Sequence, residues 1–334
     1  MSARQDYARP TFGLNRHPVR NEERILGICL EAIGGLEYPK ELVEVIVADS
    51  LSTDRSRQIA EAFGATVIPN PRQTVVSGRN CGVRASRGRF VAFTDADCLV
   101  RPDWLKAGLW AFQCERVGGA GGVTLFPDDA TPFQKAVNVL FLMASFAGAT
   151  AHRQTAPSAR FVSDIPGCNC IYRRDALSQV MPLDENLLTA EDVWLNWQLT
   201  ERGFRLAAVD GMILWHHRRS TPGSFCRQMY RFAVGRLQVG KRSRSLLSPL
   251  HIAAGFTIPL AIAAVALGFG FGETGILALA AVGACATFFG LGLARTRSFQ
   301  AALYVPMVVG VFLGVWSAGF LRELFFPMQS VDGK

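Results

Sequence analysis

Apolar and polar residues follow two different patterns, and the change comes near residue 245. Residues 20–215 alternate short apolar runs with amphipathic stretches, a pattern typical of an α/β sheet with helices between its strands. The later residues form three long apolar runs, at about 251–271, 275–293 and 301–321. The pattern predicts a globular α/β domain over residues 1–245 and a helical domain over residues 246–334.

Strands are predicted at residues 44–50, 66–69 and 89–97, and acids stand at the carboxyl ends of two of them. These acids are Asp49, Asp95 and Asp97, and an open parallel sheet forms its ligand crevice at such ends. The stretch PTFGLNRHPVRNEE precedes them, and it contains Asn15, Arg16 and His17. Such residues conflict with a central parallel strand, so we expect a very short or irregular first strand.

Each long apolar run can cross a hydrocarbon core about 30 Å thick. The runs lack a polar face, which favours transmembrane helices over a buried hairpin of core helices. Pro259 is expected to kink the first run. Arg295 and Arg297 favour a cytosolic loop, which places the carboxyl end across the membrane. Residues 133–148 are apolar but too short to span, so they indicate either an interfacial helix beside an acceptor or a core helix.

Charge and cysteine content narrow the possible partners. A formal net charge of +8 suits nucleic acid, anionic lipid or phosphorylated substrates. No nucleic-acid-binding motif occurs, so we expect membrane lipids and phosphate compounds as partners and no nucleic acid. The eight cysteines form no spaced framework, and Cys168-x-Cys170 lacks the second pair of a zinc site, so ordinary packing is expected for them.

The D-x-D of Asp95 and Asp97 is the first candidate for chemistry. In an extended segment both carboxylates point the same way and can face one Mg²⁺ or Mn²⁺. A solvated turn would explain the pair equally well.

Several segments occur in the order expected of one family. They are HPVRNEE (17–23), EVIVADSLSTD (44–54), SGRNCGVRASRGRFVAFTDADC (77–98), PGCNCIYRRD (166–175), AEDVWLNWQLTERGFRL (190–206) and RQMYRFAVGR (227–236). Together they resemble glycosyltransferase family 2, with its GT-A fold, a Rossmann-like open sheet. The chain looks most like membrane-anchored bacterial enzymes that build exopolysaccharide units on a polyprenyl diphosphate, such as the succinoglycan glucosyltransferases.

The resemblance assigns a donor and metal site. It implies that Asp49 accepts a hydrogen bond from uracil, that Asp95 contacts the ribose or metal, and that Asp97 binds the metal between the phosphates. His216 would be a third metal ligand, with a structural histidine as the alternative. The remaining residues assigned to the nucleotide pocket are Pro18, Glu22, Arg79 and Asn80.

Glu191 and Asp192 match the family's Glu-Asp pair, whose Asp is the general base. An inverting transfer needs one carboxylate to take the acceptor hydroxyl's proton. Acids also stabilise the first turn of a helix, which is the structural alternative. Gln228, Arg231 and Phe232 resemble the family's Q-x-x-R-W segment, with Phe replacing Trp, and would contact the acceptor and its diphosphate.

The expected activity is inverting transfer of a sugar from a UDP-linked donor to a lipid-linked saccharide, with a divalent metal as cofactor. The enzyme would be a multi-pass protein of the inner (cytoplasmic) membrane with a cytosolic catalytic domain. One alternative is a polyprenyl phosphate hexosyltransferase, although those enzymes usually carry Gln where Leu99 stands here. The other is an inactive, membrane-anchored sugar-nucleotide binding protein.

Overall fold

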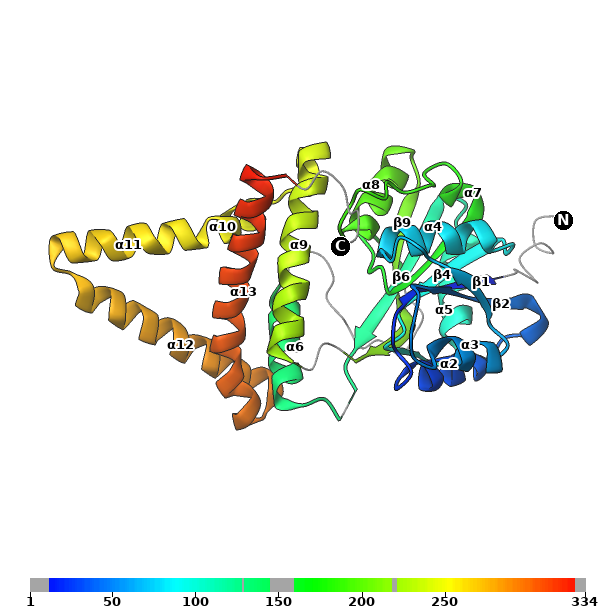
Figure 1. Ribbon diagram of the computed structural model, residues 1–334, viewed down its shortest axis with the longest axis horizontal. Coiled ribbons are helices and arrows are strands. Elements are labelled where there is room, and N and C mark those ends of the chain that lie inside the picture. Colours follow the sequence, from blue (N-terminus) through cyan, green and yellow to red (C-terminus); the bar gives the residue numbers. More distant parts are fainter. Residues whose placement is uncertain (1–11, 128, 145–158, 218–220, 328–334) are drawn as a thin grey trace. The chain divides into compact units, whose positions relative to one another are not determined.

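The computed structural model describes residues 12–127, 129–144, 159–217 and 221–327, which form two compact units (Figure 1). The sheet unit takes in described residues 12–125 and 159–217. The helical unit takes in described residues 126–127, 129–144 and 221–327. The chain therefore enters the helical unit well before residue 246, which is where the sequence pattern placed the start of the helical domain.

The sheet unit is an open mixed sheet, which confirms the predicted α/β class. Its strand order is β3-β2-β1-β4-β8-β6-β9-β5, and β7 pairs with β9. The first four strands in this order are mutually parallel, whereas β8 is antiparallel to both of its neighbours. The strands are β1 (Phe12–Val19), β2 (Val43–Asp49), β3 (Thr66–Pro69), β4 (Phe90–Thr94), β5 (Cys98–Val100), β6 (Val117–Leu125), β7 (Ala159–Val162), β8 (Asn169–Arg173) and β9 (Arg205–His216).

Helices cover both faces of this sheet (Figure 1). One face carries α2 (Leu26–Gly34), α3 (Ser56–Ala62) and α5 (Trp104–Trp110), and the other carries α4 (Val75–Ala85), α7 (Arg174–Leu177) and α8 (Glu191–Glu201). Short 3₁₀ turns occupy Lys40–Leu42 and Ala111–Gln113. The central strand β4 is buried along its whole length, and the rings of Phe90 and Phe112 lie 4.8 Å apart in the core.

The first strand was expected to be either very short or irregular, and the first of these alternatives is wrong. β1 has eight residues and lies between β2 and β4, with Asn15 aligned to Ile46 on one side and to Phe93 on the other. A parallel strand is held by backbone hydrogen bonds on both sides, so polar residues within it do not prevent pairing. The only irregularity in its pairing is a register shift against β2 between Arg16 and Val19.

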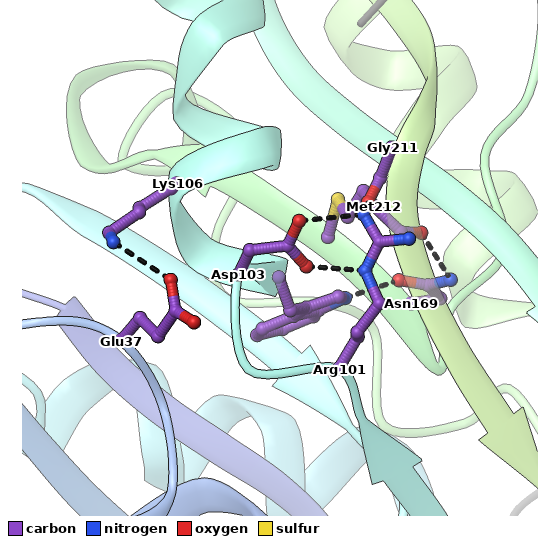
Figure 2. A network of polar contacts seen from close by, with 8 residues as sticks. Glu37, Arg101, Asp103, Lys106, Asn169, Gly211 and Met212 are labelled. Atoms are coloured by element: carbon purple, nitrogen blue, oxygen red, sulfur yellow. Dashed lines mark hydrogen bonds and ion pairs between the residues drawn. The ribbon is translucent and has the colours of Figure 1, made fainter. Parts of the chain in front are cut away.

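Strand β9 contains an insertion relative to its neighbour β6. Against β6, Gly122 pairs with Val209 but Val123 pairs with Ile213, so residues 210–212 are extra. Asn169 donates to the carbonyls of Val123 and Met212, at 3.0 and 3.3 Å. Arg101 donates to the Gly211 carbonyl at 2.8 Å (Figure 2). Beyond the insertion β9 pairs with β5, and Cys98 faces His216.

The helical unit contains one helix from the middle of the chain and five from its later part. They are α6 (Pro132–Ala144), α9 (Pro222–Arg242), α10 (Pro249–Gly255), α11 (Thr257–Phe271), α12 (Thr274–Thr296) and α13 (Phe299–Phe325), with a 3₁₀ turn at Arg244–Leu246. The residues of α6 that are buried with α9 and α13 include Phe133, Ala136 and Val137. The described part of residues 133–148 is thus a packed helix, which is the second of the two expected alternatives.

Two helices, α12 and α13, are long and apolar enough to span a membrane. They correspond to the predicted runs at 275–293 and 301–321. The first predicted run is divided into α10 and α11, which meet at a bend of 56°. Pro259 has no N–H to donate to the Gly255 carbonyl, and the Ser317 hydroxyl of α13 donates to that carbonyl instead at 2.8 Å. The bend therefore lies where a backbone hydrogen bond is missing, and Ser317 of α13 satisfies the carbonyl that would have accepted it.

Candidate active site

Two carboxylates and an imidazole meet at the end of β4. Asp95 and Asp97 follow this buried strand, and His216 ends β9. Asp97 Oδ1 lies 3.3 Å from His216 Nε2, and one ligand atom each from Asp95, Asp97, Cys98 and His216 lie within 4.8 Å of one another. Carboxylate oxygens with one imidazole nitrogen suit Mg²⁺ or Mn²⁺. The residues present therefore fit a divalent cation.

His216 is held by charge as well as by strand pairing. Its side chain is 13% exposed, and that of Asp97 is 21% exposed. Burial lowers the pKa of His216, but the Asp97 carboxylate outweighs burial and raises the pKa to about 9. In the metal-free protein the two side chains therefore form an ion pair at neutral pH.

Two cysteines, for which ordinary packing was expected, also lie at this site. Cys98 Sγ lies 3.8 Å from Asp97 Oδ1, and Cys98, Cys168 and His216 form a second group of ligand atoms within 4.8 Å of one another. Cys170 fits the expected packing role, since it is fully buried and burial raises the pKa of its thiol to about 12. In the sequence, the one indication that Cys98 lies near the metal-binding side chains was its position directly after the D-x-D.

Asp192 and Glu191 begin α8 and point to different partners. Ala190 has a left-handed backbone (φ 63°) just before the helix. Asp192 accepts hydrogen bonds from the Gly167 N–H at 3.1 Å and from the Val193 N–H at 2.8 Å, and it is half-buried. Glu191 is buried and pairs with Arg79. Of the two acids, Asp192 is therefore the one open to a substrate.

Arg79 lies beneath this helix start, on α4. Its guanidinium donates to the Gly167 carbonyl at 3.0 Å and lies 5.0 Å from the centre of the Phe93 ring. Burial lowers the pKa of Arg79, but the neighbouring acidic groups, Glu191 first among them, together raise it by more, so the side chain stays charged. Because Arg79 is buried, it can shape the site through Gly167 and Glu191.

A short segment joins the two halves of the site. The Gly167 N–H binds Asp192, and the next residue, Cys168, lies within 4.8 Å of the ligand nitrogen of His216. A Cβ on Gly167 would meet Arg79 Nη2 at 2.5 Å and Asp192 Oδ2 at 2.8 Å. The glycine therefore allows the close approach that brings the candidate base beside the candidate metal ligands.

The predicted nucleotide residues lie at or just after the ends of β1, β2 and β4 and in the middle of α4. Asp49 ends β2, is 8% exposed, and accepts a hydrogen bond from the Ser52 N–H at 3.2 Å. Glu22 follows β1, and its N–H donates to the Ser56 hydroxyl at 2.8 Å. Asn80 accepts from the Leu183 N–H at 2.8 Å and so holds a neighbouring loop. The side chain of Pro18 lies outside the described residues.

The three predicted acceptor residues lie on α9, in the helical unit. Arg231 is exposed and Gln228 is half-buried. Phe232 packs partly against the apolar clusters that α9 forms with α13. Their contact with an acceptor stays a prediction.

Comparison with known proteins gives one consistent family. Residues 17–181 match the model of "Glycosyl transferase family 2". Glycosyltransferase AglE of Haloferax volcanii is 27% identical over 230 residues, which cover 66% of this chain and 72% of AglE. The probable glycosyltransferase YdaM of Bacillus subtilis is 26% identical over 65% of this chain, and the chain spans about half (53%) of its length.

Two further comparisons bear on fold and acceptor. A Methanococcus voltae enzyme is 21% identical over 66% of this chain and 71% of its own, and its name describes a glucuronosyltransferase acting on a dolichyl N-acetylglucosaminyl phosphate. The mannosyltransferase PcManGT of Pyrobaculum calidifontis, solved with GDP-Man and Mn²⁺, superposes with a TM-score of 0.66 at 21% identity, covering 94% of this chain and 88% of that one. The likeness to PcManGT shows that the fold is GT-A.

Proposed function

Because the chain belongs to glycosyltransferase family 2 and takes its sugar from a nucleotide-sugar donor, we propose a specific donor, acceptor and stereochemistry for its reaction. It transfers one sugar, with inversion, from a UDP-linked donor to a saccharide carried by a polyprenyl diphosphate lipid. It would act at the inner (cytoplasmic) membrane, with the sheet unit in the cytosol, in the synthesis of an exopolysaccharide or another cell-surface glycan.

The observation that carries this proposal is the link between Asp192 and His216 through Gly167 and Cys168. A carboxylate and a cation-binding set stand at one site, which is what an inverting transfer requires. Asp192 takes the proton of the acceptor hydroxyl while that oxygen bonds to the anomeric carbon. The bond from that carbon to the diphosphate oxygen breaks, and the electron pair leaves with the nucleotide diphosphate. A positioned base commonly contributes about 100- to 10,000-fold to such a rate.

Asp95, Asp97 and His216 would hold the divalent cation of this reaction. When bound, the cation neutralises charge on the diphosphate leaving group. The protein itself fixes the base: two backbone N–H groups hold the Asp192 carboxylate, and the Arg79–Glu191 pair supports the same helix start. Such support keeps a catalytic group within the narrow range of productive positions.

A lipid-linked acceptor is supported by the helical unit. Helices α12 and α13 are apolar enough to span a membrane, and a soluble acceptor would give no reason to hold the enzyme there. Arg227 and Arg231 are exposed on α9, and arginine binds phosphate through paired hydrogen bonds. The name of the Methanococcus voltae relative also describes a lipid-phosphate-linked sugar as its substrate.

The test combines a donor panel with defined acceptors. Full-length protein in membranes is given UDP- and GDP-linked sugars together with a short-chain polyprenyl diphosphate saccharide, and nucleotide diphosphate release and product configuration are measured. The proposal expects one added sugar, of inverted configuration, from a UDP donor. A product built on bare polyprenyl phosphate would establish the hexosyltransferase alternative. Donor binding without any transfer would establish the inactive binding protein.

A further inference from the structure

The sheet unit holds a second set of metal-ligand atoms that overlaps the first. Sγ of Cys98, Sγ of Cys168 and a ring nitrogen of His216 lie within 4.8 Å of one another. Cys98 and His216 are register partners on β5 and β9, and Cys168 enters from the segment before β8. Three separate strands or strand ends therefore position the set, which sits on the sheet scaffold rather than on one loop.

The known spacings agree with a tetrahedral centre. Ligand atoms roughly 2.0–2.3 Å from a tetrahedral Zn²⁺ lie about 3.3–3.8 Å from one another. The ligand atoms of Cys98, Cys168 and His216 lie within 4.8 Å of one another, so small side-chain shifts bring them to this spacing. Two thiolates and one imidazole, with water in the fourth position, make a donor set that occurs at zinc sites.

We propose that Cys98, Cys168 and His216 bind a thiophilic divalent cation of the zinc class, with the fourth position open to water, in competition with the hard cation at Asp95, Asp97 and His216. Binding of the soft cation does not depend on the proposed function. Only the effect of this competition on sugar transfer rests on that function. Hard cations such as Mg²⁺ and Mn²⁺ favour the oxygen side of the site, whereas a soft cation favours the sulfur side. One His216 nitrogen cannot bind both ions, so occupancy of the two sets is mutually exclusive.

Burial indicates how the soft cation would enter. Cys98 is 1% exposed, whereas Asp97 and His216 are 21% and 13% exposed and Cys168 is half-buried. The ion would come in past Asp97 and Cys168, along the face that the proposed donor diphosphate uses. A zinc ion held on the sulfur side would keep Asp97 and His216 from the hard cation and so inhibit transfer.

The test uses Co²⁺ as an optical probe of the full-length protein in detergent, with no donor or acceptor present. Thiolate bonded to Co²⁺ gives a charge-transfer band that oxygen and nitrogen ligands do not give. The wild-type protein should show this band, and Zn²⁺ should remove it. Cys168→Ser should show a weaker band, because Cys98 is then the one remaining thiolate ligand, and should bind Co²⁺ at least about tenfold more weakly, since even outer-shell partners of a metal commonly contribute that much. Cys114→Ser and Cys285→Ser are matched controls on exposed thiols and should keep the band.

Two further measurements test the proposal: competition between Mn²⁺ and Co²⁺ for binding, and inhibition of sugar transfer by Zn²⁺. A large excess of Mn²⁺ should weaken Co²⁺ binding through the shared His216, and Zn²⁺ should inhibit transfer less in Cys168→Ser than in the wild-type protein. An unchanged band in Cys168→Ser, no band in the wild-type protein, or no competition by Mn²⁺ would each overturn the proposal. A protein that shows the thiolate band but transfers no sugar would refute the proposed function and leave this site standing.

Discussion

Glu191 Oε1 lies 3.4 Å from Arg79 Nη2, and the two side chains are 6% and 1% exposed, so the start of α8 rests on a buried ion pair. Breaking such a pair by removing one partner commonly costs about 3–5 kcal/mol, because the other charge stays buried and unpaired. The pair lies one residue from Asp192, so its loss would disturb the candidate base as well as the fold.

We therefore expect Arg79→Leu to lower the free energy of unfolding by about 3 kcal/mol or more. The double variant Arg79→Leu/Glu191→Leu should lose less than the sum of the two single variants, because neither charge is then left alone. Denaturant unfolding of the purified chain measures the free energy of unfolding of the single and double variants. Arg57→Leu breaks the exposed pair with Glu61 and should change stability by no more than about 0.5 kcal/mol. Equal effects of the exposed and buried substitutions would contradict the structural role assigned to Arg79.

Gly167→Ala tests the close approach at the centre of the site. The new Cβ would meet Arg79 Nη2 at 2.5 Å and Asp192 Oδ2 at 2.8 Å, so the carboxylate must move. Misplacement of a catalytic group is costly, and we expect turnover to fall by about tenfold or more. Gly34→Ala is the matched control, since a Cβ there has open space and favours the helix. Normal turnover of Gly167→Ala would show that the segment around Gly167 does not position the catalytic base.

Asp192→Asn tests the general base. The amide keeps the shape of the side chain but cannot take a proton, so turnover should fall by at least about 100-fold while donor binding stays near normal. Glu201→Gln, at the exposed far end of the same helix, should have no effect. Equal losses in donor binding and in rate would instead make Asp192 a helix-start residue with a structural role.

Asp97→Asn tests the hard-cation set. Removing one of its carboxylates should weaken Mn²⁺ binding by at least about tenfold, and transfer should become correspondingly dependent on added metal. The measurement is Mn²⁺ titration of the protein with and without nucleotide diphosphate. Glu37→Gln changes an exposed carboxylate whose partner is Lys106 (Figure 2) and should leave Mn²⁺ affinity unaltered. Full activity of the wild-type protein in excess chelator would also exclude a metal-dependent reaction.

Membrane topology depends on the bent pair α10 and α11. If the pair forms one span, three crossings place the carboxyl end outside the cytosol, with Arg295 and Arg297 on the cytosolic side. If only α12 and α13 cross, the carboxyl end stays in the cytosol. Reporters fused after Lys334 and inserted beside Glu273 distinguish these arrangements. We expect both reporters to be active only outside the cytosol, and cytosolic activity of the Lys334 fusion would show that the bent pair does not cross.

Periodicity was sufficient for the parts of the fold that depend on local sequence. The strands predicted at 44–50 and 66–69 are β2 and β3, and the last two apolar runs are α12 and α13. The carboxyl ends of β2 and β4 carry the acids that the sequence singled out, because side chains after a buried strand emerge at the sheet edge. Family 2 membership was predicted from ordered motifs, each of which is weak alone, and the comparisons confirm it.

Features set by contacts between distant residues could not be predicted in this way. Asn15, Arg16 and His17 argued against a central strand, yet β1 is held from both sides by its neighbours. Cys168 lies near His216 although the two are far apart in the sequence, and no motif marks the extra residues 210–212 of β9. Helices α6 and α9 lie in the helical unit because of partners far along the chain, which amphipathicity alone does not identify.

The place of α6 in the chain has a consequence for biosynthesis. Its apolar face is complete when Leu140 is made. Val305, Val308 and Val309, which cover it, leave the ribosome only after the rest of the sheet unit and helices α9 to α12. At roughly 5–20 residues per second the delay is on the order of ten seconds. During that interval α6 must be shielded by a chaperone or by the bilayer surface, which gives the nascent chain a reason to reach the membrane before its later hydrophobic helices are translated.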